Sequence, residues 1–372
     1  MPTRLKDFFD ERRVRAIGRE FRAAHAGFDE RAFAEQCLSG LDSLELIARG
    51  YQIADALERH LPRPFARSAR VLLRSLAVAP AADFQGGPLP VSFRYLPHVL
   101  FVQRYGLDDF ETSMRLQYEL TQRFTAESSI RPFLERYPEK THARLLSWVS
   151  DPSPHVRRLV SEGTRPRLPW APRLRAFQRD PRPVLQLLEL LKDDPERYVQ
   201  RSVANNLNDI GKDHPELAVE VCRRWSVDAP AGRLWIVRHA LRSLIKGGHR
   251  GALEMLGVGG RPRVRIGRIG LTPARVKLEG EVRFSFELES GAKAPQTLMI
   301  DYAVHFVKAN GGTSPKVFKL KQLTLAPLER VVLSGRVSFA NLTTRRHYPG
   351  LHRVELLING RVQPLAEFEV RR

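Results

Sequence analysis

Cysteine is nearly absent from this chain, which holds only Cys37 and Cys222 among its 372 residues. The two lie far apart in sequence and neither belongs to a C-x-x-C pair, which argues against a disulfide framework and a thiolate metal site. We expect both to be buried and to pack as apolar side chains. The histidines are scattered, without the H-x-x-x-H spacing of a helical metal site. The sequence therefore predicts no metal cofactor.

Long apolar runs are also missing. None approaches the roughly 20 residues that a transmembrane helix needs, and the opening MPTRLKDFFDERRVR lacks the apolar stretch of a signal peptide. We therefore expect a cytoplasmic protein. The chain has no G-x-x-x-x-G-K-[ST] phosphate loop and no G-x-S-x-G nucleophile elbow. Neither Lys192 nor Lys212 has an evident apolar pocket that would lower its pKa for Schiff-base chemistry.

Acidic residues are in deficit, since 61 Lys and Arg stand against 41 Asp and Glu and give a formal charge of +20. Such an excess predicts a polyanionic partner. Nucleic acid is the usual one, because each phosphate contact releases counterions. An anionic membrane surface is the alternative, but no basic amphipathic helix with a broad Trp/Phe face supports it. We therefore expect the protein to bind nucleic acid.

The sequence changes character near residue 257. Before it, apolar residues recur at three- and four-residue steps, as in GRLWIVRHALRSLIKG, which predicts helices. After it come short β-rich segments such as VRFSFELES, and two Asn-Gly pairs, in KANGGTSPK and INGR, predict hairpins. Six or seven strands in about 110 residues favour an immunoglobulin-like sandwich. We predict a mainly α chain, with a helical domain over 1–256 and an all-β domain over 257–372, divided in the glycine-rich stretch 257–260.

The helical part contains a weak internal repeat. DPSPHVRRLVSE, from Asp151, aligns with DPERYVQRSVAN, from Asp194, at an offset of 43 residues, and WIVRHALRSL follows as a third copy. A period of about 40 to 47 residues with two helices per unit is typical of HEAT or armadillo repeats. Such units stack into an α-solenoid with an extended concave wall. The sequence therefore predicts a HEAT-like solenoid before the sandwich.

One helix of this solenoid, in SVANNLNDIGKDHP (residues 202–215), is unusually polar. Its apolar residues Val203, Leu207 and Ile210 keep a helical spacing. Asn and Asp are poor interior helix residues, because their side chains compete for nearby backbone groups. The second helix of a HEAT unit lines the concave wall. We therefore expect four polar residues to face a groove: Asn205, Asn206, Asn208 and Asp209. We expect the three asparagines to contact DNA there.

Basic residues accompany this helix and continue into the β domain. A guanidinium suits phosphate because it donates two hydrogen bonds at once, although solvated surface arginines are the alternative interpretation. The residues expected to contact DNA from the groove are Arg157, Arg158, Arg165, Arg201, Lys212, Arg238 and His239. Residues 261–372 carry 20 Lys and Arg against nine Asp and Glu, which predicts that the β domain binds DNA as well. Arg261, Arg263 and Arg265 form an expected strap at its start.

Two acids and a tryptophan are candidates for chemistry. Asp209 lies at the C-terminal end of its helix, where the helix dipole does not stabilise an anion. An acid in a basic groove weakens DNA affinity, which favours another role: stabilising the positive charge on a sugar as an N-glycosidic bond breaks. That role requires its carboxylate to face the groove. Glu127 in RFTAESSIRPF is either a second such acid or a helix-capping residue. Trp170 in SEGTRPRLPWAPRL either stacks on a base or sugar or wedges two repeats together, whereas Trp148 is expected in the core.

Four segments carry a likeness to a known family: LKDFFDERRVRAIG, FDERAFAEQCLSGLDSLELIARGYQIADAL, SEGTRPRLPWAPRL and RSVANNLNDIGKDHP. Over residues 4–256 the chain resembles the bacterial DNA alkylation repair glycosylases of the AlkC family, relatives of the AlkD family among the HEAT-like repeat glycosylases. The β-rich tail looks like the immunoglobulin-like domain found in part of that family.

This resemblance implies a monofunctional glycosylase that excises 3-methyladenine and 3-methylcytosine from double-stranded DNA without metal or organic cofactor. By motif, the family's two acids and tryptophan fall on Glu127, Asp209 and Trp170. The family bends DNA instead of turning the base into a deep pocket, which implies an open concave wall. A solenoid that wraps a duplex needs no partner subunit, so we expect a monomer. A non-catalytic HEAT-repeat protein that binds bent or branched DNA is the alternative.

Overall fold

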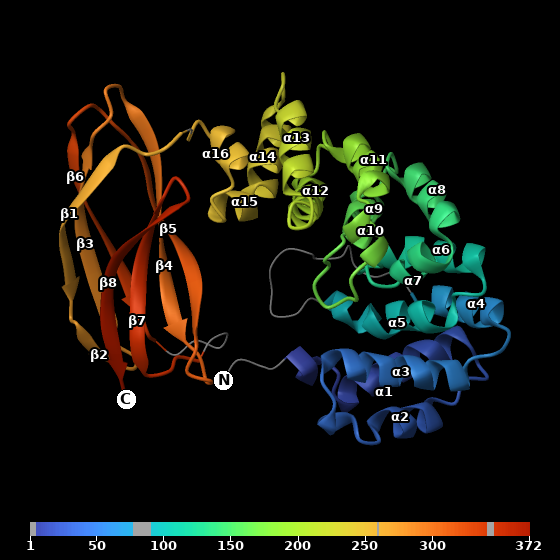
Figure 1. The fold of residues 1–372 in the computed structure, drawn as a ribbon. Coiled ribbons are helices and arrows are strands. Elements are labelled where there is room, and N and C mark those ends of the chain that lie inside the picture. The colour runs from blue at the N-terminus through green and yellow to red at the C-terminus, as the bar shows by residue number, and fades with distance from the viewer. Residues whose placement is uncertain (1–4, 77–90, 259, 341–345) are drawn as a thin grey trace. The chain divides into compact units, whose positions relative to one another are not determined.

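The structure is a computed structural model that describes residues 5–76, 91–258, 260–340 and 346–372. Within these residues, helices come first and strands follow (Figure 1). The N-terminal helical elements are η1 (Leu5–Phe8), α1 (Glu11–Ala24), α2 (Glu30–Leu38), η2 (Leu41–Ser43), α3 (Leu46–His60), α4 (Phe65–Ser75), η3 (Val91–Tyr95), α5 (Leu96–Tyr105) and α6 (Phe110–Thr121). The remaining helices are α7 (Arg131–Arg136), α8 (Pro138–Trp148), α9 (Pro154–Gly163), α10 (Arg175–Arg179), α11 (Arg182–Leu191), α12 (Arg197–Ile210), α13 (Pro215–Trp225), α14 (Ala231–Ala240), α15 (Arg242–Lys246) and α16 (Arg250–Glu254). None of the described helices is both long enough and apolar enough to cross a lipid bilayer.

The first six α-helices share one core rich in phenylalanine. Helix α1 begins after Asp10, whose carboxylate accepts a hydrogen bond from the backbone of Arg13 and so caps the helix. Its apolar stripe, which includes Val14 and Phe21, is fully buried in this core. Cys37 is buried there too, as the sequence predicts, and burial raises the pKa of its thiol to about 12.

The repeat predicted from the sequence is present as pairs of packed helices. Helix α8 packs on α9 and α11 packs on α12, and α12 lies between α9 and α14 (Figure 1). The aligned valines Val156 and Val199 are fully buried at corresponding places in α9 and α12. Trp148, at the end of α8, is buried as expected. The HEAT-like solenoid is therefore confirmed.

The strands form the predicted immunoglobulin-like sandwich. They are β1 (Val264–Thr272), β2 (Arg275–Lys277), β3 (Glu281–Ser290), β4 (Gln296–Val307), β5 (Thr313–Leu325), β6 (Arg330–Ser338), β7 (Gly350–Ile358) and β8 (Arg361–Arg371). One sheet has the order β1-β3-β6 and the other β2-β8-β7-β4-β5. All pairs are antiparallel except β2 with β8. Alternate residues of β3, including Phe284 and Phe286, point into the core between the sheets.

Both predicted Asn-Gly hairpins are found. The first joins β4 to β5, and the second joins β7 to β8 through Asn359 and Gly360. These two residues have φ values of 50° and 74°, the combination that a type I′ turn requires and that an Asn-Gly pair adopts easily.

By its internal contacts the chain divides into two compact units. One comprises Met1–Asp213 with Trp225–Ala240, and the other comprises His214–Arg224 with Leu241–Arg372. The second unit includes α15 and α16, and Leu253 of α16 packs with Met299 of the sandwich. The backbones of Gly248 and Gly360 approach so closely that a Cβ atom built on Gly360 would lie 2.3 Å from Cα of Gly248. The last described helix, α16, ends at Glu254, and the first strand, β1, begins at Val264. The predicted domain boundary between residues 256 and 257 stays a prediction.

Candidate active site

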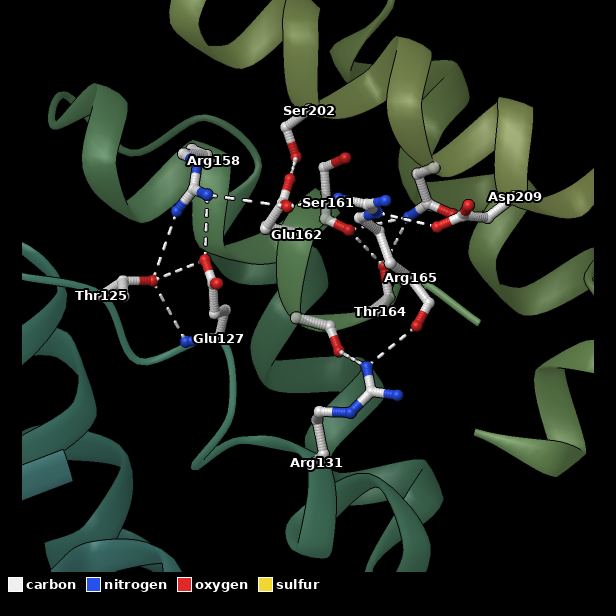
Figure 2. A network of polar contacts seen from close by, with 12 residues as sticks. Thr125, Glu127, Arg131, Arg158, Ser161, Glu162, Thr164, Arg165, Ser202 and Asp209 are labelled. Carbon is white, nitrogen blue, oxygen red and sulfur yellow. Dashed lines mark hydrogen bonds and ion pairs between the residues drawn. The ribbon is translucent and has the colours of Figure 1, made fainter. Parts of the chain in front are cut away.

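A chain of alternating charges crosses the first unit, and Figure 2 shows it from Glu127 to Asp209. Its members, in order of contact, are Glu127, Arg158, Glu162, Arg165, Asp209 and Lys212. The repeat places them together, since α9 and α12 lie side by side and supply or adjoin most of the six. The two acids predicted for chemistry, Glu127 and Asp209, are its terminal carboxylates.

Glu127 lies in the turn before α7. Its Oε2 accepts a hydrogen bond from the hydroxyl of Thr125 at 2.8 Å and pairs with Nη2 of Arg158 at 2.9 Å. Within the described ranges, no hydrogen bond or ion pair engages its other oxygen, and 23% of the side chain is exposed. Burial alone would lower the pKa of Arg158, but Glu127 and Glu162 outweigh it and raise that pKa. Glu127 is therefore held at one oxygen and open at the other.

Glu162 joins the two ends of the network. Its Oε1 lies 2.6 Å from Nη1 of Arg165 and 3.6 Å from Nη2 of Arg158, and its Oε2 accepts a hydrogen bond from Ser202 at 2.6 Å. Burial alone would raise the pKa of Glu162, but both arginines and the Ser202 hydroxyl outweigh burial, so this pKa is lowered. Glu162 is therefore an anion under ordinary conditions.

Asp209 is buried, with only 2% of its side chain exposed. Its Oδ2 pairs with Nε of Arg165 and its Oδ1 with Nζ of Lys212, each at 2.8 Å. The expectation that this carboxylate is open to the groove is therefore wrong for the protein without DNA. The two cations that pair with Asp209 differ in exposure: the side chain of Arg165 is 10% exposed, whereas that of Lys212 is 42% exposed.

Two asparagines of α12 also depart from the prediction. Asn206 is fully buried, and its amide donates to the carbonyl of Ser161 and to the hydroxyl of Thr164. Asn208 is also buried and donates to the carbonyl of Ala240. The prediction that they face a groove and contact DNA is wrong, because α12 is covered on two sides, by α9 and by α14. Asn205 is partly exposed, and its DNA contact stays a prediction.

The loop after α9 carries Trp170, whose residue surface is 72% exposed. Its φ of 62° is a left-handed conformation that bulky residues rarely adopt. The neighbouring chain is held firmly: Arg131 donates to the carbonyls of Gly163, Arg165 and Pro172 at 3.1, 2.9 and 2.5 Å. Burial lowers the pKa of Arg131 to about 10. The wedge interpretation of Trp170 is therefore excluded for this conformation.

Trp170 and Glu127 line one cavity of about 380 Å³. Besides Trp170, four aromatic residues contribute to its wall: Tyr51, Phe93, Phe124 and Tyr198. Arg158 lies at the same wall, with its guanidinium 5.0 Å from the ring of Tyr198. The absence of a deep base-binding pocket stays a prediction, and Glu127 lies beside a hollow that Trp170 also lines.

The basic residues predicted to contact DNA fall into two groups. Arg157 is bound to Asp194 through two hydrogen bonds, at 2.6 and 3.1 Å, and with Arg158 and Arg165 it belongs to buried ion pairs. Others are exposed: Arg201, Lys212, Arg238, Arg261, Arg263 and Arg265. His239 stacks on Trp235, with ring centroids 4.8 Å apart. Their contacts with DNA stay predictions, and the exposed group is better placed for them.

The sequence did not single out Glu162 and Arg131 as parts of the site. Arg131 lies 32 residues before the first carbonyl that it binds, which is too far for the spacing to indicate the contact. The internal repeat could have pointed to Glu162. It lies one helical turn after Arg158, on the same helix as Val156 and Val160, which align with valines of the second repeat. Among the described residues, no group of three or more His, Cys, Asp or Glu side chains is arranged to hold a metal ion.

The chain is a two-part helical-repeat protein: a HEAT-like solenoid that holds a network of carboxylates and arginines comes first, and an immunoglobulin-like domain follows it. The sequence model of one family, the C-terminal Ig-like domain of uncharacterised protein YhaZ, matches residues 265–372. "Uncharacterized protein YhaZ" of Bacillus subtilis (strain 168) is 35% identical over 370 residues, 98% of this chain and 99% of that protein. The Pseudomonas fluorescens alkylpurine DNA glycosylase AlkC, solved bound to DNA containing an abasic site analog, is 38% identical with a TM-score of 0.90 and full coverage of both chains. The chain belongs to the AlkC family.

Proposed function

We propose that this protein is a DNA glycosylase that removes alkylated bases. The observation that carries the proposal is its likeness to AlkC over the whole of both chains, at 38% identity and a TM-score of 0.90. Its partner is double-stranded DNA, in keeping with the charge of +20 and with the exposed arginines of both units. We propose 3-methyladenine and 3-methylcytosine as its substrates. We also propose that the protein is cytoplasmic and monomeric.

The proposed chemistry is hydrolysis of the N-glycosidic bond. An N3-methylated base is cationic and leaves readily, because the electrons of the bond between C1′ and the base nitrogen neutralise it. The positive charge then develops on the sugar. A carboxylate beside C1′ stabilises this charge, and it accepts the proton of the water that adds to C1′. No lyase step is included, so the proposed enzyme is monofunctional.

Asp209 is the carboxylate that we assign to this role. Its Oδ1 is covered by Lys212, the more exposed of its two partners. A DNA phosphate offers the Lys212 ammonium another anion at the protein surface. We propose that Lys212 turns to the phosphate when DNA binds, which opens Oδ1 toward the sugar while Arg165 still holds Oδ2. Glu127 adds negative potential through its open oxygen, and Trp170 contacts the sugar or the cationic base.

The proposal is tested by base release from methylated duplex DNA, quantified by mass spectrometry for wild type and Asp209→Asn. Asp194→Asn is the matched control, because Asp194 is also a buried carboxylate paired with an arginine of α9. We expect release by wild type and by the control, and a loss of at least about 100-fold in Asp209→Asn, comparable to the loss of one charge-stabilising group in other enzymes.

The outcomes separate the candidate functions. Equal release by wild type and Asp209→Asn contradicts the role of Asp209. If wild type releases no base but binds bent or branched duplexes, the protein is a non-catalytic DNA-binding solenoid. The ratio of 3-methyladenine to 3-methylcytosine released by wild type gives the substrate preference.

A further inference from the structure

Glu162 is the one carboxylate of the network that contacts both of its arginines. Oε1 faces Arg158 on one side and Arg165 on the other, and Oε2 is fixed by the hydroxyl of Ser202 (Figure 2). The side chain is 7% exposed, so solvent screens these contacts little. Glu162 does not line the cavity beside Glu127 and Trp170, as far as the described residues define that cavity. Its role is therefore exerted through the arginines.

The charges of the network balance only because Glu162 is present. Three carboxylates, Glu127, Glu162 and Asp209, meet three cations. If Glu162 were neutral, Arg158 and Arg165 would have only the two outer acids as partners. Each outer carboxylate would then be more fully neutralised by its arginine, and the cluster would carry a net positive charge close to where the sugar cation forms. A buried cation without its partner also tends to move toward solvent or another anion.

We infer that Glu162 is a positioning residue of the proposed reaction: it holds and neutralises Arg158 and Arg165, and thereby fixes Glu127 and Asp209 and preserves their negative potential. This inference rests on the proposed glycosylase function. Ser202, one turn before the asparagine-rich part of α12, holds Glu162 in turn. The two proposed acids lie on different elements, 82 positions apart in the sequence, and are in this way coupled through Arg158, Glu162 and Arg165.

The test compares Glu162→Gln with wild type and with the control Asp194→Asn. Glutamine keeps the size of the side chain and can still accept from Ser202, but it removes the charge. Single-turnover base release at saturating enzyme should fall about 10- to 100-fold in Glu162→Gln, the loss that slight misplacement of reacting groups causes. It should stay within twofold of wild type in Asp194→Asn, although both substitutions break a buried ion pair and should lower Tm.

Two further readouts separate positioning from a loss of stability. The affinity for duplex DNA with a neutral tetrahydrofuran abasic analogue should change less than twofold in Glu162→Gln. The affinity for the same duplex with a pyrrolidine analogue, which is cationic like the developing sugar charge, should fall several-fold. Glu162→Asp, which keeps the charge, should recover part of both the rate and the preference for pyrrolidine.

Each outcome decides a different point. A wild-type rate in Glu162→Gln, beside an active wild type and an inactive Asp209→Asn, overturns this inference and leaves the proposed function standing. Equal losses in Glu162→Gln and Asp194→Asn also overturn it, because the effect would then follow stability. If wild type releases no methylated base, the proposed function fails first and the inference fails with it.

Discussion

His98 is a residue-scale feature outside the candidate site. Its ring is fully buried, 5.2 Å from the ring of Phe21, and its Nδ1 has no hydrogen-bond partner among the described residues. Burial, helped by the charge of Arg94, lowers the pKa of His98 to about 3. The folded protein therefore holds this histidine neutral over most of the acid range.

This burial predicts a pH-dependent stability. The ordinary histidine pKa is 6.5, so below that pH the unfolded chain takes up a proton that the folded chain refuses until about pH 3. Stability is therefore lost as the pH falls through this window, by about 2 kcal/mol at pH 5. Between pH 7 and pH 5, Tm should fall more in wild type than in His98→Gln, as measured by differential scanning calorimetry. His25→Gln, at a partly exposed site, should behave as wild type, and identical pH profiles for all three would contradict the expectation.

Single residues also show where sequence reasoning stops. Burial of Cys37 and Trp148 follows from their apolar neighbours in the sequence and was predicted. Burial of Asn206 and Asn208 was not, because helical spacing identifies one packed face of α12 and not a second one. The second face exists because α14 lies on it, and the amide of Asn208 satisfies the carbonyl of Ala240, 32 positions away. Asn206 and Asn208 therefore join α12 to its neighbours instead of lying at the surface.

At the scale of elements, Arg131 at the start of α7 holds the loop that carries Trp170. Its three bonds reach the backbone on both sides of the tryptophan, so the fork of the guanidinium matters as well as its charge. The ammonium of a lysine cannot span these carbonyls. We expect Arg131→Lys to lower the free energy of unfolding by about 1–3 kcal/mol, the cost of leaving buried polar groups unpaired.

The loop itself should report this change. Trypsin should cleave Arg131→Lys faster after Arg167 or Arg173 than it cleaves wild type, as followed by mass spectrometry of the fragments. Arg136→Lys, at an exposed position of the same helix, should leave the cleavage rate unchanged. Equal cleavage in all three proteins would show that other contacts hold the loop. The sequence predicted a tryptophan in an extended basic segment, but its anchor lies too far away in sequence to be inferred from spacing.

The type and order of the elements were predictable to a greater extent. Apolar residues at three- and four-residue steps predict the helices, short β-rich segments predict strands such as β3, and the Asn-Gly pair predicts the turn at Asn359. The pairing of Glu162 with two arginines was not predictable, because it depends on how α9 and α12 meet. The candidate acids follow from their places in the sequence and then from the family motifs, whereas the contact of Lys212 with Asp209 is seen only in the structure.

At the scale of the whole molecule, the charge of +20 sets the expected response of DNA binding to salt. Six residues predicted to contact DNA are exposed: Arg201, Lys212, Arg238, Arg261, Arg263 and Arg265. If each of these six residues contacts a phosphate, the logarithm of the binding constant should fall linearly with the logarithm of the salt concentration, with a slope of about −5. Fluorescence anisotropy with a labelled duplex measures this slope.

A matched pair of variants checks the assignment. Arg238→Ala should reduce the slope by about 1, because one phosphate contact is lost. Arg31→Ala removes another exposed arginine, which lies in α2 and pairs with Glu35, and it should leave the slope unchanged. A slope near zero in wild type would contradict DNA binding through these residues.

The contact between Gly248 and Gly360 has a consequence for any attempt to alter this protein. Both residues have positive φ, and neither has room for a Cβ atom, because the backbone of the other already occupies that space. A larger residue at one position cannot be compensated by a smaller residue at the other, because no residue is smaller than glycine. A library that randomises either position and selects for folded protein should return glycine at both, and grafting the sandwich onto another scaffold should require carrying residue 248 along.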